Sequence, residues 1–201
     1  MIISWQGFNN FKLKNTKTSI VLNPYNLDKK TKLRKLKTDI VLFSNSKKIK
    51  ESKIDKESFI ISSPGEYEVR DVFIYGREID NNIIYYIMFD DLKIAFLGEF
   101  NNKELKNEDL ELIEGSDILI LPVGGGELTN SKNAVKIISQ VEPRIVIPSC
   151  YKAGTFNLET EDLSVFVKDF GIKPEKLDKF KISKKDLPQN ELKLIILNIN
   201  K

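Results

Sequence analysis

The sequence predicts a layered α/β fold in which β-sheets are covered by helices on their outer faces. Two observations support this prediction. Apolar residues alternate with polar ones through most of the first half of the chain, a period typical of half-buried strands. After Gly98 the apolar period lengthens towards 3.6 residues, and strands alternate with helices. No linker or low-complexity segment interrupts the 201 residues, so we expect one domain over residues 1–201.

The first half of the chain is expected to form short strands. Each strand is an apolar or alternating run bounded by turn residues such as Asn23-Pro24, Pro64-Gly65 and Asp90-Asp91. The expected strands cover residues 2–5, 11–13, 19–22, 40–43, 59–62, 66–69, 72–75, 83–89 and 93–97. A basic connection over 29–37 and a loop or short helix over 47–56 lie between some of them. The later strands follow one another closely and therefore predict a meander.

The second half is expected to combine helices with buried strands. One helix covers residues 104–113 and ends at Gly115, a second begins at a Ser131 cap, and a third begins at a Thr160 cap and ends at Gly171. Four apolar residues of the second helix share one face: Ala134, Ile137, Ile138 and Val141. Further strands are expected over 117–121, 144–147, 180–183 and 192–199.

Composition places the chain among ordinary globular proteins. Hydrophobic residues make up 41% and charged residues 30%, which argues against a disordered chain. No apolar run approaches the roughly 20 residues needed to cross a bilayer, and the first residues lack the pattern of a signal peptide. The single cysteine, Cys150, cannot form an internal disulfide. We therefore expect a cytoplasmic protein with no membrane partner.

Positive charge is concentrated in one segment. The net charge is +3, but residues 29–56 contain eleven Lys or Arg and three acidic residues. Such a block can bind nucleic acid through its phosphates, although most charge runs are solvated surfaces. Polyanion or RNA binding through residues 29–56 is therefore one alternative function.

A series of segments, taken in order, resembles the metallo-β-lactamase superfamily and in particular its ascorbate-6-phosphate-lactonase-like branch. The segments are ISWQGFNNF, VLNPY, TDIVLFS, SSPGEYEV, VFIYG, IAFLGE, DILILPVGGG and AVKIISQVEPRIVIPSCYK. The resemblance runs over nearly the whole chain. It implies a four-layer αββα sandwich with a metal site at one edge, formed by loops that follow the strands.

The same resemblance implies that the metal ligands of the family have been replaced. The chain has no histidine. Phe8 follows Gly7 where the family has a histidine, and the family's His-x-His-x-Asp-His motif aligns with residues 45–50. The former metal-ligand positions hold Asn45, Lys47, Ile49, Lys50, Glu99 and Cys150.

The chemistry of these residues does not favour a metal. Catalytic zinc takes about three protein ligands from imidazole, thiolate and carboxylate. Of the side chains at these positions, Glu99 and Cys150 could still ligate an ion, while Lys47 and Lys50 would repel it. The expectation is therefore that the protein has no cofactor, although zinc or manganese is expected for the family.

The sequence thus predicts a degenerate metallo-β-lactamase-fold protein without hydrolase activity, which acts by binding or assembly. The expected partner is a second copy, in a homo-oligomer, or a related active protein. An alternative is a metal-dependent or Cys-dependent hydrolase with an altered site at Glu99 and Cys150. If Lys47 and Lys50 point into the old metal pocket, their charges would attract an anionic small molecule.

Overall fold

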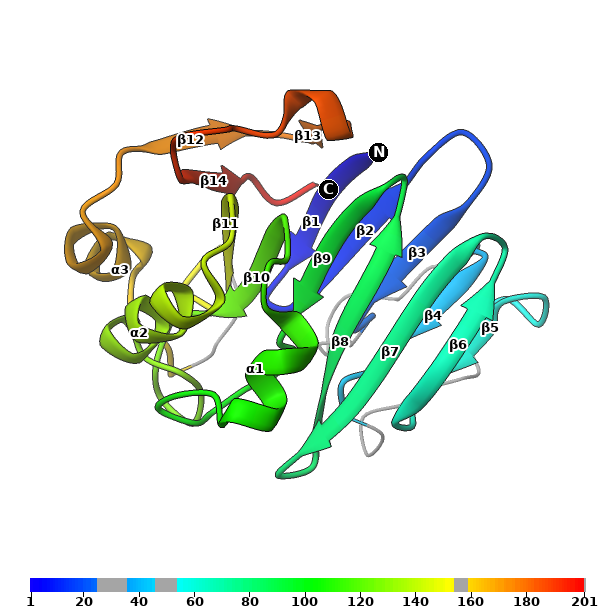
Figure 1. Cartoon of the computed structure of the whole chain (residues 1–201), viewed down its shortest axis with the longest axis horizontal. Coiled ribbons are helices and arrows are strands. Elements are labelled where there is room, and N and C mark those ends of the chain that lie inside the picture. Colours follow the sequence, from blue (N-terminus) through cyan, green and yellow to red (C-terminus); the bar gives the residue numbers. More distant parts are fainter. Residues whose placement is uncertain (25–35, 46–53, 154–158, 201) are drawn as a thin grey trace.

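The computed structural model describes residues 1–24, 36–45, 54–153 and 159–200, and within them two β-sheets pack face to face (Figure 1). The six-stranded sheet contains, in spatial order, β13 (Phe180–Lys181), β1 (Ile2–Gly7), β2 (Asn10–Lys14), β3 (Ser19–Leu22), β4 (Ile40–Leu42) and β5 (Phe59–Ile61). The eight-stranded sheet contains β12 (Pro174–Leu177), β14 (Lys193–Leu197), β11 (Ile145–Ser149), β10 (Ile118–Pro122), β9 (Leu92–Phe96), β8 (Asn82–Phe89), β7 (Val72–Ile79) and β6 (Gly65–Val69).

The helices of the described residues belong to the second half of the chain. They are α1 (Asn107–Ile113), α2 (Ser131–Val141), α3 (Leu163–Phe170) and a short 3₁₀ helix, η3 (Lys184–Asp186). Helix α2 contacts β10, α1 and α3, so this group covers the eight-stranded sheet beside β9–β11 (Figure 1). None of the helices in this described part is long and apolar enough to cross a membrane.

Alternation along the strands builds the core between the sheets. Ile3 and Trp5 on β1, and Phe11 and Leu13 on β2, are at most 2% exposed, whereas the residues between them are polar or partly exposed. Strands β10 and β11 are buried at every position, as expected for parallel strands covered on both faces. The expected meander is confirmed by the antiparallel pairing of β6 with β7, β7 with β8 and β8 with β9.

On its outer side, the six-stranded sheet carries a smaller apolar cluster. Val41 and Phe43 are buried there together with Ile54, and Leu36 packs against them. Most of residues 29–37 and 47–56 lies outside the described residues, so the basic connection and the loop or short helix stay predictions. With two packed sheets and outer helices, the predicted α/β sandwich is confirmed.

Helix caps and one strand differ from the sequence-based expectation. Asn130, not Ser131, caps α2, because its side chain accepts the Asn133 N–H at 3.0 Å. Asp162, not Thr160, caps α3 by accepting the Ser164 N–H at 2.8 Å. Strand β12 was not predicted, because it has no apolar run and is defined by its backbone pairing with β14.

Candidate functional site

The carboxyl ends of strands from both sheets meet at one end of the sandwich, where the chain leaves β1, β3, β4, β9, β10 and β11. Just after β3 and β4, Asn23 and Ser44 bind each other twice. The Asn23 amide donates to Ser44 Oγ at 2.7 Å, and the Ser44 N–H donates to Asn23 Oδ1 at 2.7 Å. Both residues are fully buried. These bonds position the chain just before Asn45.

Gly98 joins β9 to Glu99 in a crowded place. Its φ of +61° lies in the left-handed region. A Cβ on Gly98 would lie 2.4 Å from Ser44 Cβ and 2.6 Å from Asn82 Oδ1. Only a residue without a side chain therefore lets the two sheets approach at this point.

Asn82 ties the β7–β8 hairpin to the end of β9. The turn before it, Asp80-Asn81, has φ values of +50° and +64°, which Asp and Asn tolerate better than most residues. The Asn82 carboxamide accepts the Glu99 N–H at 2.7 Å and donates to Leu97 O at 2.9 Å. Asn82 is 6% exposed, so both bonds are shielded from water.

Asn45 and Glu99 come together as the family resemblance implies. The Asn45 amide donates to Glu99 Oε2 at 3.4 Å, across the gap between the ends of β4 and β9. Both residues are partly exposed and line the same cavity. The pair therefore forms part of the wall of this cavity, which is described below.

Cys150 is buried next to Phe8, a residue that lines this cavity. It is 0% exposed, with φ of +56°, and it accepts a weak hydrogen bond from Ser149 Oγ at 3.6 Å. Its N–H donates to Phe8 O at 3.0 Å, and the Trp5 indole donates to the same oxygen at 3.0 Å. A Cβ on Gly124 would lie 2.1 Å from Cys150 O. Cys150 is therefore buried, with its backbone packed against Phe8 and Gly124, and it is not among the described residues that line the cavity.

The cavity at this end has a volume of about 820 Å³. Four carboxylates, four asparagine carboxamides and the Phe8 ring are prominent in its wall. Its described lining consists of Phe8, Asn45, Asp80, Asn81, Asn82, Glu99, Asn101, Gly125, Gly126, Glu127, Leu128, Glu159 and Thr160. Neither Lys nor Arg belongs to that described lining.

Two buried polar groups near this wall lack partners. Thr160 Oγ1, in the lining, has no hydrogen bond within the described part of the chain. Asn9, next to Phe8 in the chain, is 0% exposed, and neither end of its carboxamide is hydrogen-bonded to a described residue. Such groups are uncommon in folded proteins and are usually satisfied by water or a ligand.

Sequence reasoning identified part of this wall and missed the rest. Asn45 and Glu99 lie together on the cavity, while Lys47, Ile49 and Lys50 fall outside the described residues. Asn82, Glu127 and Glu159 were missed. Asn82 begins β8, whereas Glu127 and Glu159 come from two separate loops, and the turn signal at Asp80-Asn81 was the sole local hint.

The described side chains at the former metal-ligand positions do not fit a zinc ion. Asn45 is a poor zinc ligand, and Cys150 is fully buried and absent from the described lining of the cavity that Glu99 lines. Across residues 1–24, 36–45, 54–153 and 159–200, no three His, Cys, Asp or Glu side chains gather in a way that could hold a metal.

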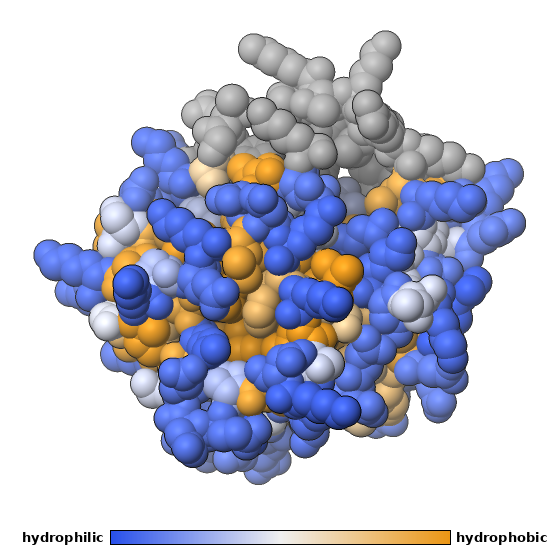
Figure 2. Space-filling model, turned by 90° about the horizontal axis from the view of Figure 1, so that it is seen from above, coloured by the Kyte–Doolittle hydropathy of each residue, from blue (hydrophilic) through white to orange (hydrophobic). Residues whose placement is uncertain are grey.

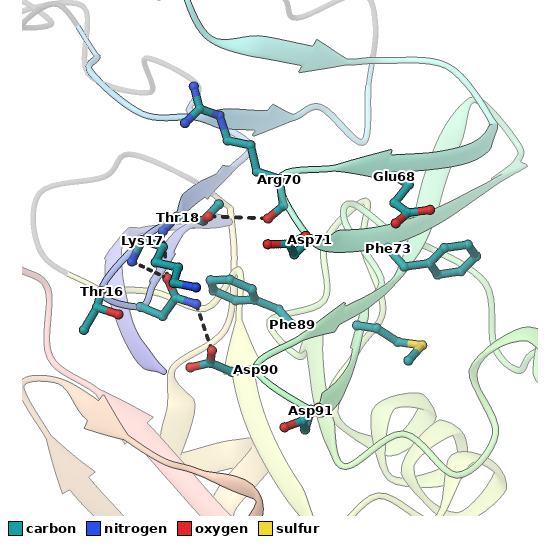
Figure 3. A pocket seen from close by; sticks show the side chains of 12 residues that line it. Thr16, Lys17, Thr18, Glu68, Arg70, Asp71, Phe73, Phe89, Asp90 and Asp91 are labelled. Carbon is teal, nitrogen blue, oxygen red and sulfur yellow. Dashed lines mark hydrogen bonds between the residues drawn. The ribbon is translucent and has the colours of Figure 1, made fainter.

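A second cavity, of about 490 Å³, lies at the opposite end of the sandwich (Figure 3). The β2–β3, β6–β7 and β8–β9 turns form it. Thr18 Oγ1 donates to Arg70 O at 3.5 Å, and the Asn15 amide donates to Asp90 Oδ1 at 2.8 Å. None of the residues predicted for the site lines this cavity, so the first cavity is the candidate site.

Comparisons with known proteins agree with the fold. A family model described as "Beta-lactamase superfamily domain" matches residues 2–149. A structure from Thermotoga maritima, named as a candidate Zn-dependent hydrolase of the metallo-β-lactamase superfamily, is 24% identical with a TM-score of 0.84. The match covers 98% of this chain and all of that one.

Two more distant structures share the fold. The metallo hydrolase from Ignicoccus hospitalis is 17% identical with a TM-score of 0.65, over 90% of this chain and 99% of that chain. The diiron β-hydroxylase from Streptomyces venezuelae is 8% identical with a TM-score of 0.60, over 98% of this chain and 52% of that one.

These names contradict the expectation that the protein has no cofactor, since the similar structures are named as Zn-dependent or diiron proteins. That expectation was drawn from six aligned positions, of which three lie outside the described residues. The lactonase-like branch stays a prediction. The family match covers most of the sequence and the sandwich matches throughout, so the chain belongs to the metallo-β-lactamase superfamily.

Proposed function

We propose that this chain uses the superfamily sandwich to bind a small polar ligand in the 820 Å³ cavity and does not catalyse the superfamily's hydrolysis. The observation that carries the proposal is the wall chemistry. Carboxylates and carboxamides surround a space of ligand size, and the buried Thr160 hydroxyl lacks a partner among the described residues. These groups suit a ligand with hydroxyl or ammonium donors.

The absence of histidine from the sequence supports the loss of hydrolysis. Histidine is the commonest general acid or base in proteins, and its loss leaves carboxylates, lysines, six tyrosines and one thiol for proton transfer. Cys150 is 0% exposed, which disfavours the alternative of a Cys-dependent hydrolase.

The hydrolysis half of the proposal is tested with protein incubated with Zn²⁺ or Mn²⁺. Turnover of a nitrophenyl ester, a simple lactone and a bis-nitrophenyl phosphate is measured for the wild type, Glu99→Gln and Cys150→Ser. We expect equal rates near the buffer rate for all three proteins. A metal-dependent rate that falls at least tenfold in Glu99→Gln contradicts the proposal and favours the altered hydrolase.

The binding half is tested by thermal unfolding with three probes of different charge: myo-inositol, spermidine and glucose 6-phosphate. We expect stabilisation by inositol or spermidine, because the described wall has four carboxylates and no cationic side chain. A ligand at a hundred times its Kd stabilises by about 2.7 kcal/mol. Glu99→Gln should weaken the effect, whereas Glu111→Gln, exposed on α1, should not.

Stabilisation by glucose 6-phosphate alone contradicts the prediction that the ligand is neutral or positively charged. It would favour the hypothesis that Lys47 and Lys50 attract an anion. No stabilisation by any probe at millimolar concentration counts against ligands of these classes. Association with a second copy or a related active protein stays a prediction, which light scattering after size-exclusion chromatography would measure.

A further inference from the structure

A groove on the outer face of the six-stranded sheet is separate from the candidate site. It has a volume of about 760 Å³ and lies over β13, β1 and β2. Its lining is Met1, Ile2, Ser4, Lys12, Lys14, Asn15, Thr16, Asp90, Lys179, Lys181 and Asn200. Four of these side chains are lysines, and one is acidic.

Strand register places the lysines on a common face. Ile2 pairs with Lys14 on one side and with Lys181 on the other, and residues paired across antiparallel strands point the same way. Ser4 pairs with Lys12 in the next row. The intervening residues Ile3, Trp5, Phe11 and Leu13 point into the core and are at most 2% exposed. Lys12, Lys14 and Lys181 therefore face outward together.

The positive charge of this face is only partly offset within the described residues: hydrogen bonds from Ser183 and the charge of Lys181 lower the pKa of the nearby Asp186 carboxyl. None of the four lysines forms a salt bridge there. Asp90, the acidic residue of the lining, already contacts the amino group of Met1 and the Asn15 amide, each at 2.8 Å. Like charges gathered on one sheet face destabilise the folded protein. An anionic partner would relieve that repulsion.

The spacing fits an extended anion. Lys12 and Lys14 are about 7 Å apart along β2, and Lys14 and Lys181 are about 10 Å apart across three strands. A neighbouring cavity of about 300 Å³ shares Lys14 and adds three basic residues, Lys17, Lys37 and Arg70, together with two acidic ones, Asp39 and Glu57. Figure 2, which is coloured by hydropathy and not by charge, views this end of the sandwich and shows hydrophilic side chains around an apolar area. The basic surface thus extends well beyond a single phosphate group.

From this geometry we propose that the groove over β13, β1 and β2 binds the phosphate backbone of a nucleic acid strand. Lys12, Lys14, Lys179 and Lys181 contact phosphates, and the exposed Ile2 packs between them, beneath the sugar–phosphate chain. The described lining contains no aromatic side chain on which bases could stack. Binding is therefore insensitive to sequence. The groove is at the other end of the sandwich from the 820 Å³ cavity, so this inference does not rest on the function proposed for that cavity.

The test is fluorescence anisotropy with a labelled single-stranded 20-nucleotide RNA of mixed sequence, between 50 and 200 mM salt. Four phosphate contacts predict a slope of log K against log salt of about −3. Lys14→Glu/Lys181→Glu should weaken binding at least tenfold at 50 mM salt and reduce the slope by more than 1. Lys132→Glu/Lys136→Glu, on the exposed side of α2, carries the same charge change and should stay within twofold of the wild type.

Three outcomes overturn the proposal: no binding by the wild type at 50 mM salt, equal weakening in both double variants, or loss of binding in Lys29→Glu/Lys30→Glu with none in the groove variant. The last result assigns the RNA to the basic segment 29–56. Vesicles with and without phosphatidylserine give a further check. Binding to anionic vesicles without binding to RNA overturns the proposal in favour of a lipid surface. Unchanged thermal unfolding of the variants shows that they remain folded.

Discussion

The two ends of the sandwich are built in different ways. At the candidate-site end, side chains from one strand bind the backbone of another, as Asn82 does with Leu97 and Glu99. At the opposite end, short hairpin turns such as Arg70-Asp71 and Asp90-Asp91 reverse the chain. Residues of these turns form partly exposed ion pairs, Arg70 with Asp39 and Asp90 with the amino group of Met1. Both ends contain residues of positive φ. The difference teaches that burial separates the two ends. Hydrogen bonds between distant residues at the site end, such as Asn23 with Ser44 and Asn82 with Leu97, are buried, whereas those that join the turns at the far end, such as Asn15 with Asp90 and Thr18 with Arg70, are exposed or partly buried.

The largest effect is expected from Gly98→Ala, which adds a methyl group at a crowded contact between the two sheets. The new methyl group would meet Ser44 Cβ at 2.4 Å in a left-handed backbone conformation. We expect a loss of about 3 kcal/mol in the free energy of unfolding. Urea unfolding measures it. Gly115→Ala is the matched control: its φ is +68° but no atom lies within 4 Å, so about 1 kcal/mol is expected. Equal losses would contradict the claimed crowding.

Asn82→Ala should have the next largest effect. The substitution leaves the Glu99 N–H and the Leu97 carbonyl without their buried partner, which costs about 2 kcal/mol. Asn102→Ala is a control at the same end, since it removes only an exposed hydrogen bond to Asp80 and should cost about 0.5 kcal/mol. If Asn82→Ala costs no more than Asn102→Ala, the site end is not held by these long-range bonds.

The pH dependence of the stability of Asp39→Asn tests the contribution of a carboxylate at the far end. Burial acts to raise the pKa of Asp39, but hydrogen bonds from Ser19 and the charge of Arg70 outweigh it and lower the pKa. A lowered pKa in the folded state means that the carboxylate stabilises the protein above its unfolded pKa and that this is lost as pH falls through the folded pKa. Asp39→Asn should therefore cost about 1 kcal/mol at pH 7.

The cost of Asp39→Asn should shrink below pH 4, in denaturant unfolding followed at both pH values. Glu57→Gln, an exposed neighbour in the same shallow cavity, serves as the control and should change stability by less than about 0.5 kcal/mol at either pH. A cost for Asp39→Asn that persists unchanged at pH 3 would rule out the carboxylate charge as its origin.

Arg70→Gln should have the smallest effect. Its guanidinium lies 3.1 Å from Asp39 Oδ1, but the Arg70 side chain is 56% exposed. Exposed ion pairs contribute little because water and salt screen them, so a loss of about 0.5 kcal/mol or less is expected. A loss above about 1.5 kcal/mol in urea unfolding would mean that this exposed ion pair contributes as much as the buried hydrogen bonds of the site end.

The elements best predicted from the sequence were those with a local signal. The strands of the meander and the inner face of α2 follow from periodicity, and Gly171 ends α3 in the left-handed conformation as expected. The cap of α3 was missed by two residues because Thr160 and Asp162 are both good capping residues. Strand β12 was missed because backbone pairing with β14, and not side-chain pattern, defines it.

Site residues were predicted unevenly for a similar reason. Asn45 and Glu99 could be found because each directly follows a buried strand in a segment that resembles the family. Glu127 and Glu159 could not, because each is an ordinary acidic residue in its own loop, and only the packing of the loops brings both to the cavity. Cys150 was a candidate on position alone, and its burial depends on Phe8 and Gly124.

By itself the sequence determined the order of strands and helices, the lack of any imidazole, and the superfamily resemblance, because these depend on residue type and on periodicity along the chain. The tertiary structure alone decided which polar side chains share the cavity, that the Cys150 thiol is enclosed, and that four lysines gather on one face of β13, β1 and β2. The physical reason is that these features arise from contacts between residues far apart in the chain, which strand pairing and sheet packing create.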